Sequence, residues 1–195
     1  MSFSIQTKVS IRLLSGGHSF SVSAIDQAAK SVIGDAVVEI VTPKTTLVPA
    51  AVFRAEVAVD CLAMVGLAPS VDEVVVFSPE VDDRVAVMAI DKACFAHLSL
   101  VFGDAVTFVS PLIMGRVPKD GVLIELVDSV LYVRIFNGGM LFGEAIEAKN
   151  DADLLFAIES INKVYHIYNM RVCAKGDVAR LKLCFKNIFT NLVCE

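Results

Sequence analysis

The sequence predicts an α/β protein made of two halves, each a mixed β-sheet with helices packed on it. Apolar residues make up 55% of the 195 residues and charged residues 20%, so the chain can bury a sizeable core. One order of elements (three strands, helix, strand, helix, strand) occurs twice, with one extra strand in the first half. The stretch PLIMGRVPKDG, residues 111–121, interrupts the pattern with prolines and glycines. We therefore expect domains at 1–116 and 117–195.

The first half opens with a predicted β-hairpin. Residues 8–14 and 18–25 alternate apolar and polar side chains, and Ser15-Gly16-Gly17 between them is typical of a tight turn. A third strand is predicted at residues 37–41.

A helix is predicted to begin at Pro49, because proline suits the first helical turn, where its missing N–H costs nothing. Its apolar face would carry Phe53, Val57, Cys61 and Met64, at helical spacing. Gly66 is the expected end of this helix. Strands are then predicted at 73–77 and 84–90.

The next helix should begin after Asp91, which can cap it, and end at Gly103. Its predicted apolar face includes Cys94 and Leu98. A strand at 106–109 completes the first half.

The second half is predicted to contain strands at 122–127, 130–136 and 140–146. A helix should follow from Asp151 to Tyr168, capped by Asn150. A strand at 171–174 and a helix from Asp177 to Asn187 come next, and the tail FTNLVCE is expected to add an edge strand.

The charge pattern argues against nucleic-acid binding. The net charge is −5 and the isoelectric point is near 5.2, whereas nucleic-acid binders usually carry a basic face. The densest basic run, from Lys175 to Lys186, fits a solvated helix face. The chain has no Trp and three Tyr, which leaves few aromatic side chains to stack on bases.

Membrane insertion is not expected either, although the mean hydropathy is +0.67. A spanning helix needs about 18 or more uninterrupted apolar residues, and the richest region, residues 85–114, is broken by Asp91, Lys92 and Asp104. The first residues, MSFSIQTKVSIRLL, lack the basic region and apolar core of a secretory signal. We expect a cytoplasmic protein.

The five cysteines predict neither a metal centre nor a disulfide framework, because their number is odd and no CxxC pair occurs. Cys61, Cys94 and Cys184 fall on predicted apolar helix faces, where cysteine acts as a small hydrophobe. We expect these three thiols to be buried, reduced and unpaired. The acidic loop with Glu80, Asp82 and Asp83 is interpreted as a solvated turn rather than a cation site.

The repeated order of elements resembles the plan of the actin-like (ribonuclease H-like) fold, in which two sheets with helices flank a cleft. Three stretches also resemble an uncharacterised bacterial family of unknown function, which is itself similar to actin-like ATPases in fold. They are VSIRLLSGGHSFSV, TTLVPAAVF and LYVRIFNGGMLFGEAIEAKNDADLLFAI, and the resemblance extends over nearly the whole chain. It implies the actin-like fold and no activity.

The resemblance also indicates where a nucleotide would bind. In actin-like ATPases a phosphate turn after the first strand of each half carries an Asp that holds a metal-bound water and a Gly that admits the phosphate. Here Ser15, Gly16 and Gly17 supply glycines without the acid, and Asp128-Ser129 supplies the acid without the glycine. The purine site would need a Gly-Gly pair before a late helix, where this chain has Gly176 alone.

Because each of these three motifs is incomplete, Asp128-Ser129 is interpreted as the bend of a hairpin. We expect no catalytic residue, no cofactor and no metal. The sequence favours a non-catalytic interaction or scaffold module, whose partner is an unidentified protein or a second copy of the chain. A degenerate nucleotide-binding protein or slow ATPase remains the alternative, and it would use Ser15, Gly16, Gly17, Asp128, Ser129 and Gly176.

Overall fold

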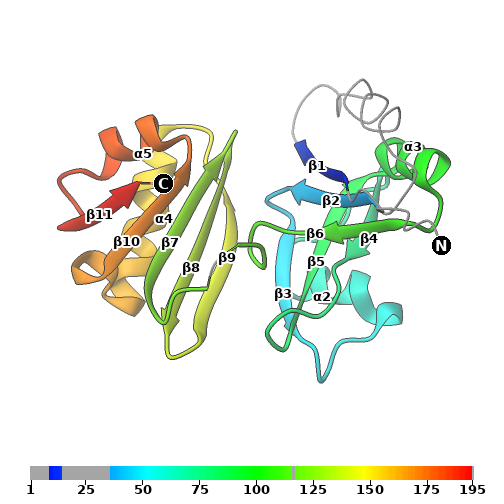
Figure 1. Cartoon of the computed structure of the whole chain (residues 1–195), viewed down its shortest axis with the longest axis horizontal. Coiled ribbons are helices and arrows are strands. Elements are labelled where there is room, and N and C mark those ends of the chain that lie inside the picture. The colour runs from blue at the N-terminus through cyan, green and yellow to red at the C-terminus, as the bar shows by residue number, and fades with distance from the viewer. Residues whose placement is uncertain (1–8, 15–35, 116, 195) are drawn as a thin grey trace, which may run out of the picture. The chain divides into compact units, whose positions relative to one another are not determined.

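The computed structural model describes residues 9–14, 36–115 and 117–194. The chain divides into two compact units between Ile113 and Met114, and each unit is an α/β arrangement of sheets and helices (Figure 1). The predicted strand at 18–25 and the predicted turn Ser15-Gly16-Gly17 lie outside the described residues.

The first unit contains two three-stranded sheets. The parallel sheet has the order β1-β2-β6 and the antiparallel sheet the order β3-β5-β4. The strands are β1 (Val9–Leu14), β2 (Ala36–Val41), β3 (Thr45–Pro49), β4 (Glu73–Phe77), β5 (Arg84–Asp91) and β6 (Val106–Val109). The described residues of this unit therefore form two sheets, whereas the sequence predicted a single mixed sheet.

Both faces of β5 are buried, which explains why its sequence is almost continuously apolar. Ala86, Met88 and Ile90 pack with α3 (Lys92–Phe102) and the parallel sheet. The intervening side chains pack instead on α2 (Ala58–Met64), which a short 3₁₀ helix, η1 (Ala55–Val57), precedes. One apolar layer therefore joins β5 to α3 and the parallel sheet, and the layer on its other face joins it to α2.

The prediction of a helix beginning at Pro49 is wrong about where the helix begins and about which of its residues face the core. Thr45–Pro49 is strand β3, which pairs antiparallel with β5, and proline is tolerated there because β3 is an edge strand. The helix that follows buries Ala58 and Leu62, while Met64 is 86% exposed. Helical spacing within the segment could not reveal that its first residues pair with a strand far along the chain.

The predicted caps of the two longer helices are confirmed. Asp91 accepts hydrogen bonds from the first backbone N–H groups of α3, which ends at Gly103. Asn150 and Asp153 form a capping box at the start of α4 (Asp151–Tyr165). This helix ends at Tyr165, three residues earlier than predicted, because His166 takes a left-handed conformation before the 3₁₀ helix η2 (Ile167–Asn169).

The second unit is one mixed sheet with the order β11-β10-β7-β8-β9. Strands β7, β10 and β11 are mutually parallel, and β8 runs antiparallel between β7 and β9. The strands are β7 (Asp120–Val127), β8 (Val130–Asn137), β9 (Met140–Glu147), β10 (Arg171–Gly176) and β11 (Asn191–Cys194). The predicted C-terminal edge strand is thus confirmed.

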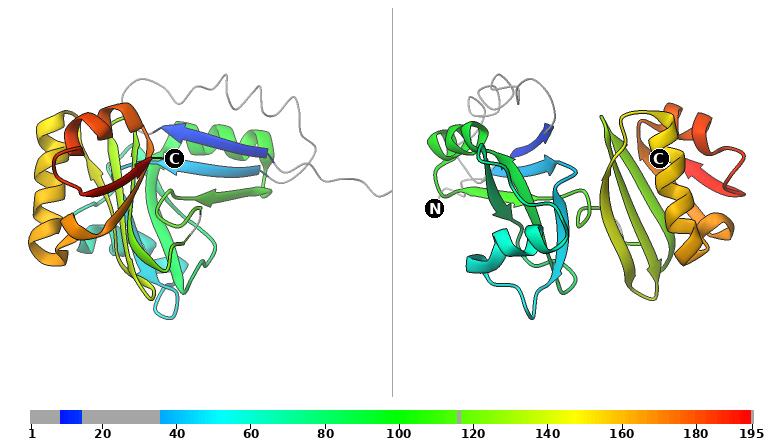
Figure 2. Two further views of the ribbon diagram at one scale, coloured as in Figure 1. Left: turned by 60° about the vertical axis from the view of Figure 1, so that its left-hand side comes forward. Right: turned by 180° about the vertical axis from the view of Figure 1, so that it is seen from behind.

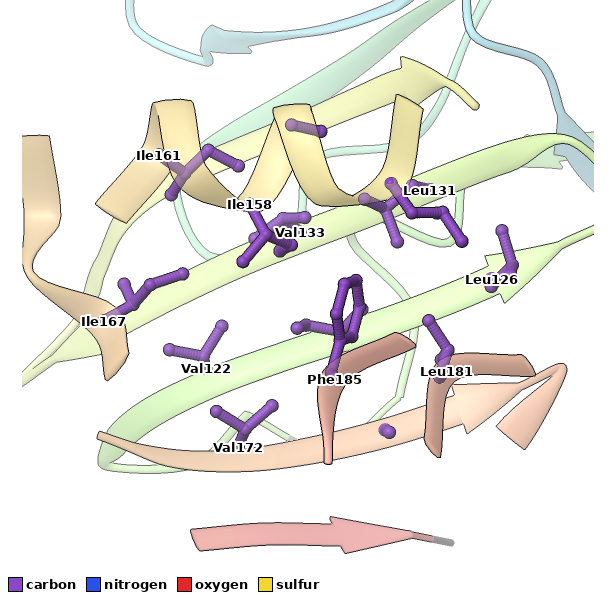
Figure 3. Close-up of a cluster of buried hydrophobic side chains, with 14 of the residues drawn as sticks. Val122, Leu126, Leu131, Val133, Ile158, Ile161, Ile167, Val172, Leu181 and Phe185 are labelled. Carbon is purple, nitrogen blue, oxygen red and sulfur yellow. The ribbon is translucent and has the colours of Figure 1, made fainter. Parts of the chain in front are cut away.

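Helices α4 and α5 (Val178–Phe185) cover one face of this sheet (Figure 2). Side chains of both helices, such as Ile158, Ile161 and Phe185, pack on Val122 and Val133 of the central strands (Figure 3). Their shared core holds the ends of α4 and α5 in place at the edge of the sheet where the candidate site lies.

Candidate functional site

The turn between β7 and β8 is a two-residue hairpin connection made by Asp128 and Ser129. Val127 pairs with Val130 across it, and Asp128 has a φ of 53°, a left-handed conformation that aspartate tolerates better than most residues. The hydroxyl of Ser129 donates to Asp128 Oδ2 at 3.2 Å, and the Ser129 carbonyl accepts from Ala148 N–H at 2.7 Å. Hairpin geometry therefore accounts for the conformation of both residues.

A glycine is required at position 176, at the end of β10, because the backbone there approaches β7 closely. Gly176 pairs with Leu126 and has a φ of 78°, and a Cβ atom there would lie 2.0 Å from the Leu126 carbonyl oxygen. The same oxygen accepts from Asp177 N–H at 2.8 Å. This glycine thus has a structural role that does not depend on a purine.

The N-terminus of α5 is capped by a side chain of the protein. Asp177 Oδ1 accepts from Arg180 N–H at 3.0 Å and caps the helix. The Arg180 guanidinium donates through Nε to Asp151 Oδ1 at 2.7 Å, and this hydrogen bond is the main cause that lowers the pKa of Asp151. The Asp177 carboxylate therefore takes one of the N–H donors that a phosphate at this helix end would use.

These contacts bring three connections together at the carboxyl ends of the parallel strands β7 and β10. They are the β7–β8 turn, the segment between β9 and α4, and the β10–α5 junction. In open α/β sheets this end of the strands is the usual ligand site. Asp128, Asp151 and Asp177 are exposed there, and Asp151 is paired with Arg180.

The structure thus brings Asp128, Ser129 and Gly176 to one edge, as a residual nucleotide site would require, while Ser15, Gly16 and Gly17 lie outside the described residues. Sequence reasoning missed the contact between Arg180 and Asp151. Nothing local could have revealed it, because their elements meet only through the packing of α4 against α5. The capping role of Asp177 did have a local signal, its position just before an apolar periodic segment.

Within residues 9–14, 36–115 and 117–194, no three His, Cys, Asp or Glu side chains are grouped as a metal site requires. Asp82 and Asp83 of the acidic loop both have positive φ values, and Val81 pairs with Arg84 around them. These values fit a two-residue hairpin turn, so the loop has a structural explanation.

None of the five cysteines, all of which the structure describes, forms a disulfide, but the predicted burial is wrong for two of the three. Cys94 is buried, whereas Cys61 and Cys184 are only half-buried. Cys61 lies beside the buried pair of α2, since Ala58 and Leu62 face the core. Burial and, to a smaller extent, the Asp151 carboxylate raise the pKa of Cys184, which lies at the edge of α5.

We expect Cys94 to resist alkylation in the folded protein. Burial, and to a smaller extent the Asp91 carboxylate, raises its pKa to about 12. The reactive thiolate is therefore on the order of one molecule in ten thousand at pH 8. Mass mapping after a timed iodoacetamide pulse should show modified Cys61 and unmodified Cys94, with both modified in denaturant. Equal labelling of the two in the folded protein would contradict the burial of Cys94.

No protein-family model and no curated protein sequence matches this chain. Membership of the bacterial family suggested by the sequence is therefore not confirmed. None of the helices among the described residues has the length and apolar character needed to cross a bilayer.

Two solved structures share the fold. The first is a Bacteroides thetaiotaomicron protein described as having an actin-like ATPase fold and unknown function. It superposes with a TM-score of 0.77 at 15% identity, over 97% of this chain and 91% of that chain. The second is the cytoplasmic domain of EpsL, an inner-membrane component of the type II secretion system of Vibrio cholerae. Its TM-score is 0.50 at 15% identity, over 96% of this chain and 85% of that chain. The chain therefore has an actin-like fold, and identities this low extend the likeness no further than the fold.

Proposed function

We propose that this protein is a non-catalytic interaction or scaffold module on an actin-like fold that has lost its nucleotide motifs. In this proposal residues 1–116 and 117–195 are the two duplicated halves of that fold, in keeping with the division into two compact units. Membership of the uncharacterised bacterial family belongs to the same proposal, as does a cytoplasmic location.

The single observation that carries the proposal is the state of the edge where a nucleotide would bind. Asp128-Ser129 closes a hairpin, Gly176 is fixed by its approach to Leu126, and Asp177 caps the helix that a phosphate would approach. Phosphoryl transfer depends on metal positioning and on charge neutralisation at the phosphates. This arrangement favours neither, so in this proposal the fold acts through contacts with a protein partner or a second copy.

A degenerate nucleotide-binding protein or slow ATPase is the second candidate. One observation favours it, namely that Asp128, Ser129 and Gly176 do converge at the carboxyl ends of parallel strands. The two functions differ in a measurable way, because a bound nucleotide stabilises the folded state.

Melting with and without ATP and Mg²⁺ tests the proposal. Ligand at one hundred times its dissociation constant stabilises a protein by about 2.7 kcal/mol, a shift that a melting scan resolves. We expect no shift at millimolar ATP with Mg²⁺. A concentration-dependent rise in Tm, accompanied by Mg²⁺-dependent release of phosphate, would establish the slow ATPase instead.

Replacing Asp128 by Ala should affect only the turn. The free energy of unfolding should change by no more than about 1 kcal/mol, because the carboxylate lies at an exposed turn. Asp128→Gly is the matched variant, since glycine accepts the positive φ without strain, and it should be at least as stable as Asp128→Ala. ATP turnover by the original protein that is lost in both variants would contradict the proposal.

A further inference from the structure

Strand β9 is the outer strand on one side of the second unit's sheet (Figure 1). Among the described strands it pairs only with β8, so no described strand is paired along the other edge of β9 from Leu141 to Glu147. An exposed edge of this length is a template for an added strand.

A groove of about 390 Å³ runs between β9 and α4. Ile146, Ala157 and Ile161 supply apolar surface, and Phe156 lies beside them with 73% of its surface exposed. A large aromatic side chain left exposed next to an open strand edge suits an interface better than a free surface.

The groove is also acidic, since Glu144, Glu147 and Asp153 line it and no Lys or Arg does. Glu147 pairs with Lys149 at 3.0 Å, and Asp153 accepts from Asn150 N–H at 3.1 Å in the capping box. Glu144 has no cationic partner among the described residues. It pairs with Val133, a core residue, so its side chain projects on the helix-covered face of the sheet, toward the groove.

We propose that β9 and this groove bind an extended segment of a partner protein, which adds to the sheet as a further strand. The segment would carry a lysine or arginine opposite Glu144 and an apolar side chain, two residues away on the same face, against Phe156 and Ile146. Backbone hydrogen bonds to an edge strand supply affinity in this mode of recognition, and alternate side chains supply specificity. This inference rests on the proposed interaction role and names its surface and the chemistry of its partner.

A second copy of this chain is a poorer occupant of the same edge. Antiparallel pairing of β9 with another β9 about Glu144 would place this carboxylate opposite the same carboxylate of the other copy, and like charges across a strand pair are destabilising. Charge complementarity therefore selects a basic segment over self-association.

The test uses the full chain and two eight-residue peptides. In the first probe lysine and valine alternate along one face and threonine fills the other; in the second, glutamate replaces lysine. We expect the lysine probe to bind, measured by fluorescence anisotropy, and to slow amide hydrogen exchange in β9. Glu144→Lys should weaken that binding at least about tenfold and restore binding of the glutamate probe. Phe156→Ala should weaken the binding of each probe to the protein that binds it.

Glu80→Lys is the control, because it reverses an exposed carboxylate of the first unit. Equal weakening by Glu80→Lys and Glu144→Lys would show a general attraction to an acidic protein and overturn the proposal. Binding of the lysine probe without slower amide hydrogen exchange in β9 would also overturn the proposal. The same holds for a concentration-dependent dimer through β9 that Glu144→Lys strengthens. ATP binding in the melting scan would overturn the proposed function, whereas the peptide measurements test the β9 surface independently of that result.

Discussion

Replacing Gly176 by Ala should destabilise the second unit by about 3 kcal/mol or more, among the larger costs of a single substitution. The new Cβ atom would lie 2.0 Å from the Leu126 carbonyl oxygen. That atom belongs to the backbone of a central strand, so it cannot move aside as a flexible side chain could. The left-handed φ of 78° adds roughly 1 kcal/mol for a residue with a Cβ atom. We expect β10 to separate from β7 at this end.

Tyrosine fluorescence can measure this loss in the second unit alone. The chain has no Trp and three Tyr, namely Tyr132, Tyr165 and Tyr168, and all lie in that unit. Gly138→Ala is the matched control, because Gly138 has a similar φ of 69° and nothing within 4 Å of the added carbon. It should cost only about 1 kcal/mol. If urea unfolding shows equal losses for the two variants, the close approach of β10 to β7 is not as described.

Replacing Phe185 by Ala should cost about 3–5 kcal/mol, the usual range for deleting a fully buried aromatic side chain. Phe185 has no exposed surface, and its ring meets that of Phe189 edge-on with centroids 5.7 Å apart. Its removal would leave a cavity between α5 and the sheet (Figure 3).

Phe156→Ala removes the same atoms from an exposed position on α4 and is the control for this substitution. We expect its stability to stay within about 0.5 kcal/mol of the original, measured by the same tyrosine signal. A small loss for Phe185→Ala would mean that α5 does not pack on the sheet. A large loss for Phe156→Ala would mean that this side chain stabilises the fold and is not held ready for a partner.

The candidate site depends on the core that these substitutions test. Gly176 and the α5 cap are placed by the packing of β10 and α5 on β7, and the Arg180–Asp151 pair by the packing of α5 beside α4. The carboxylates of Asp151 and Asp177 are thus held at this edge by the fold. Asp151 is exposed, and its hydrogen bond to Arg180 lowers its pKa. The contribution of the pair is present above the unfolded pKa of Asp151 and is lost as the pH falls through the folded value.

The sequence by itself determined the elements whose signals are local. Asp91 and Asn150 mark helix starts because a capping side chain reaches a backbone N–H only two or three residues away. The hairpin at Asp128-Ser129 was likewise predicted from turn residues between two apolar segments. The interpretation of this turn as a hairpin bend rather than a phosphate turn rested on the missing glycine, and it stays a prediction.

Only the tertiary structure decided which distant segments meet. Thr45–Pro49 became a strand because β5 offers it a partner, although its own residues also fit a helix start. The burial of Cys61 and Cys184 depended on the exact direction of each helix face, and a small rotation moves a side chain from the core to its rim. The parallel pairing of Gly176 with Leu126 and the open edge of β9 have no local signal. Pairing free energy is gained between residues far apart in sequence, so spacing within a segment cannot encode which partner it will find.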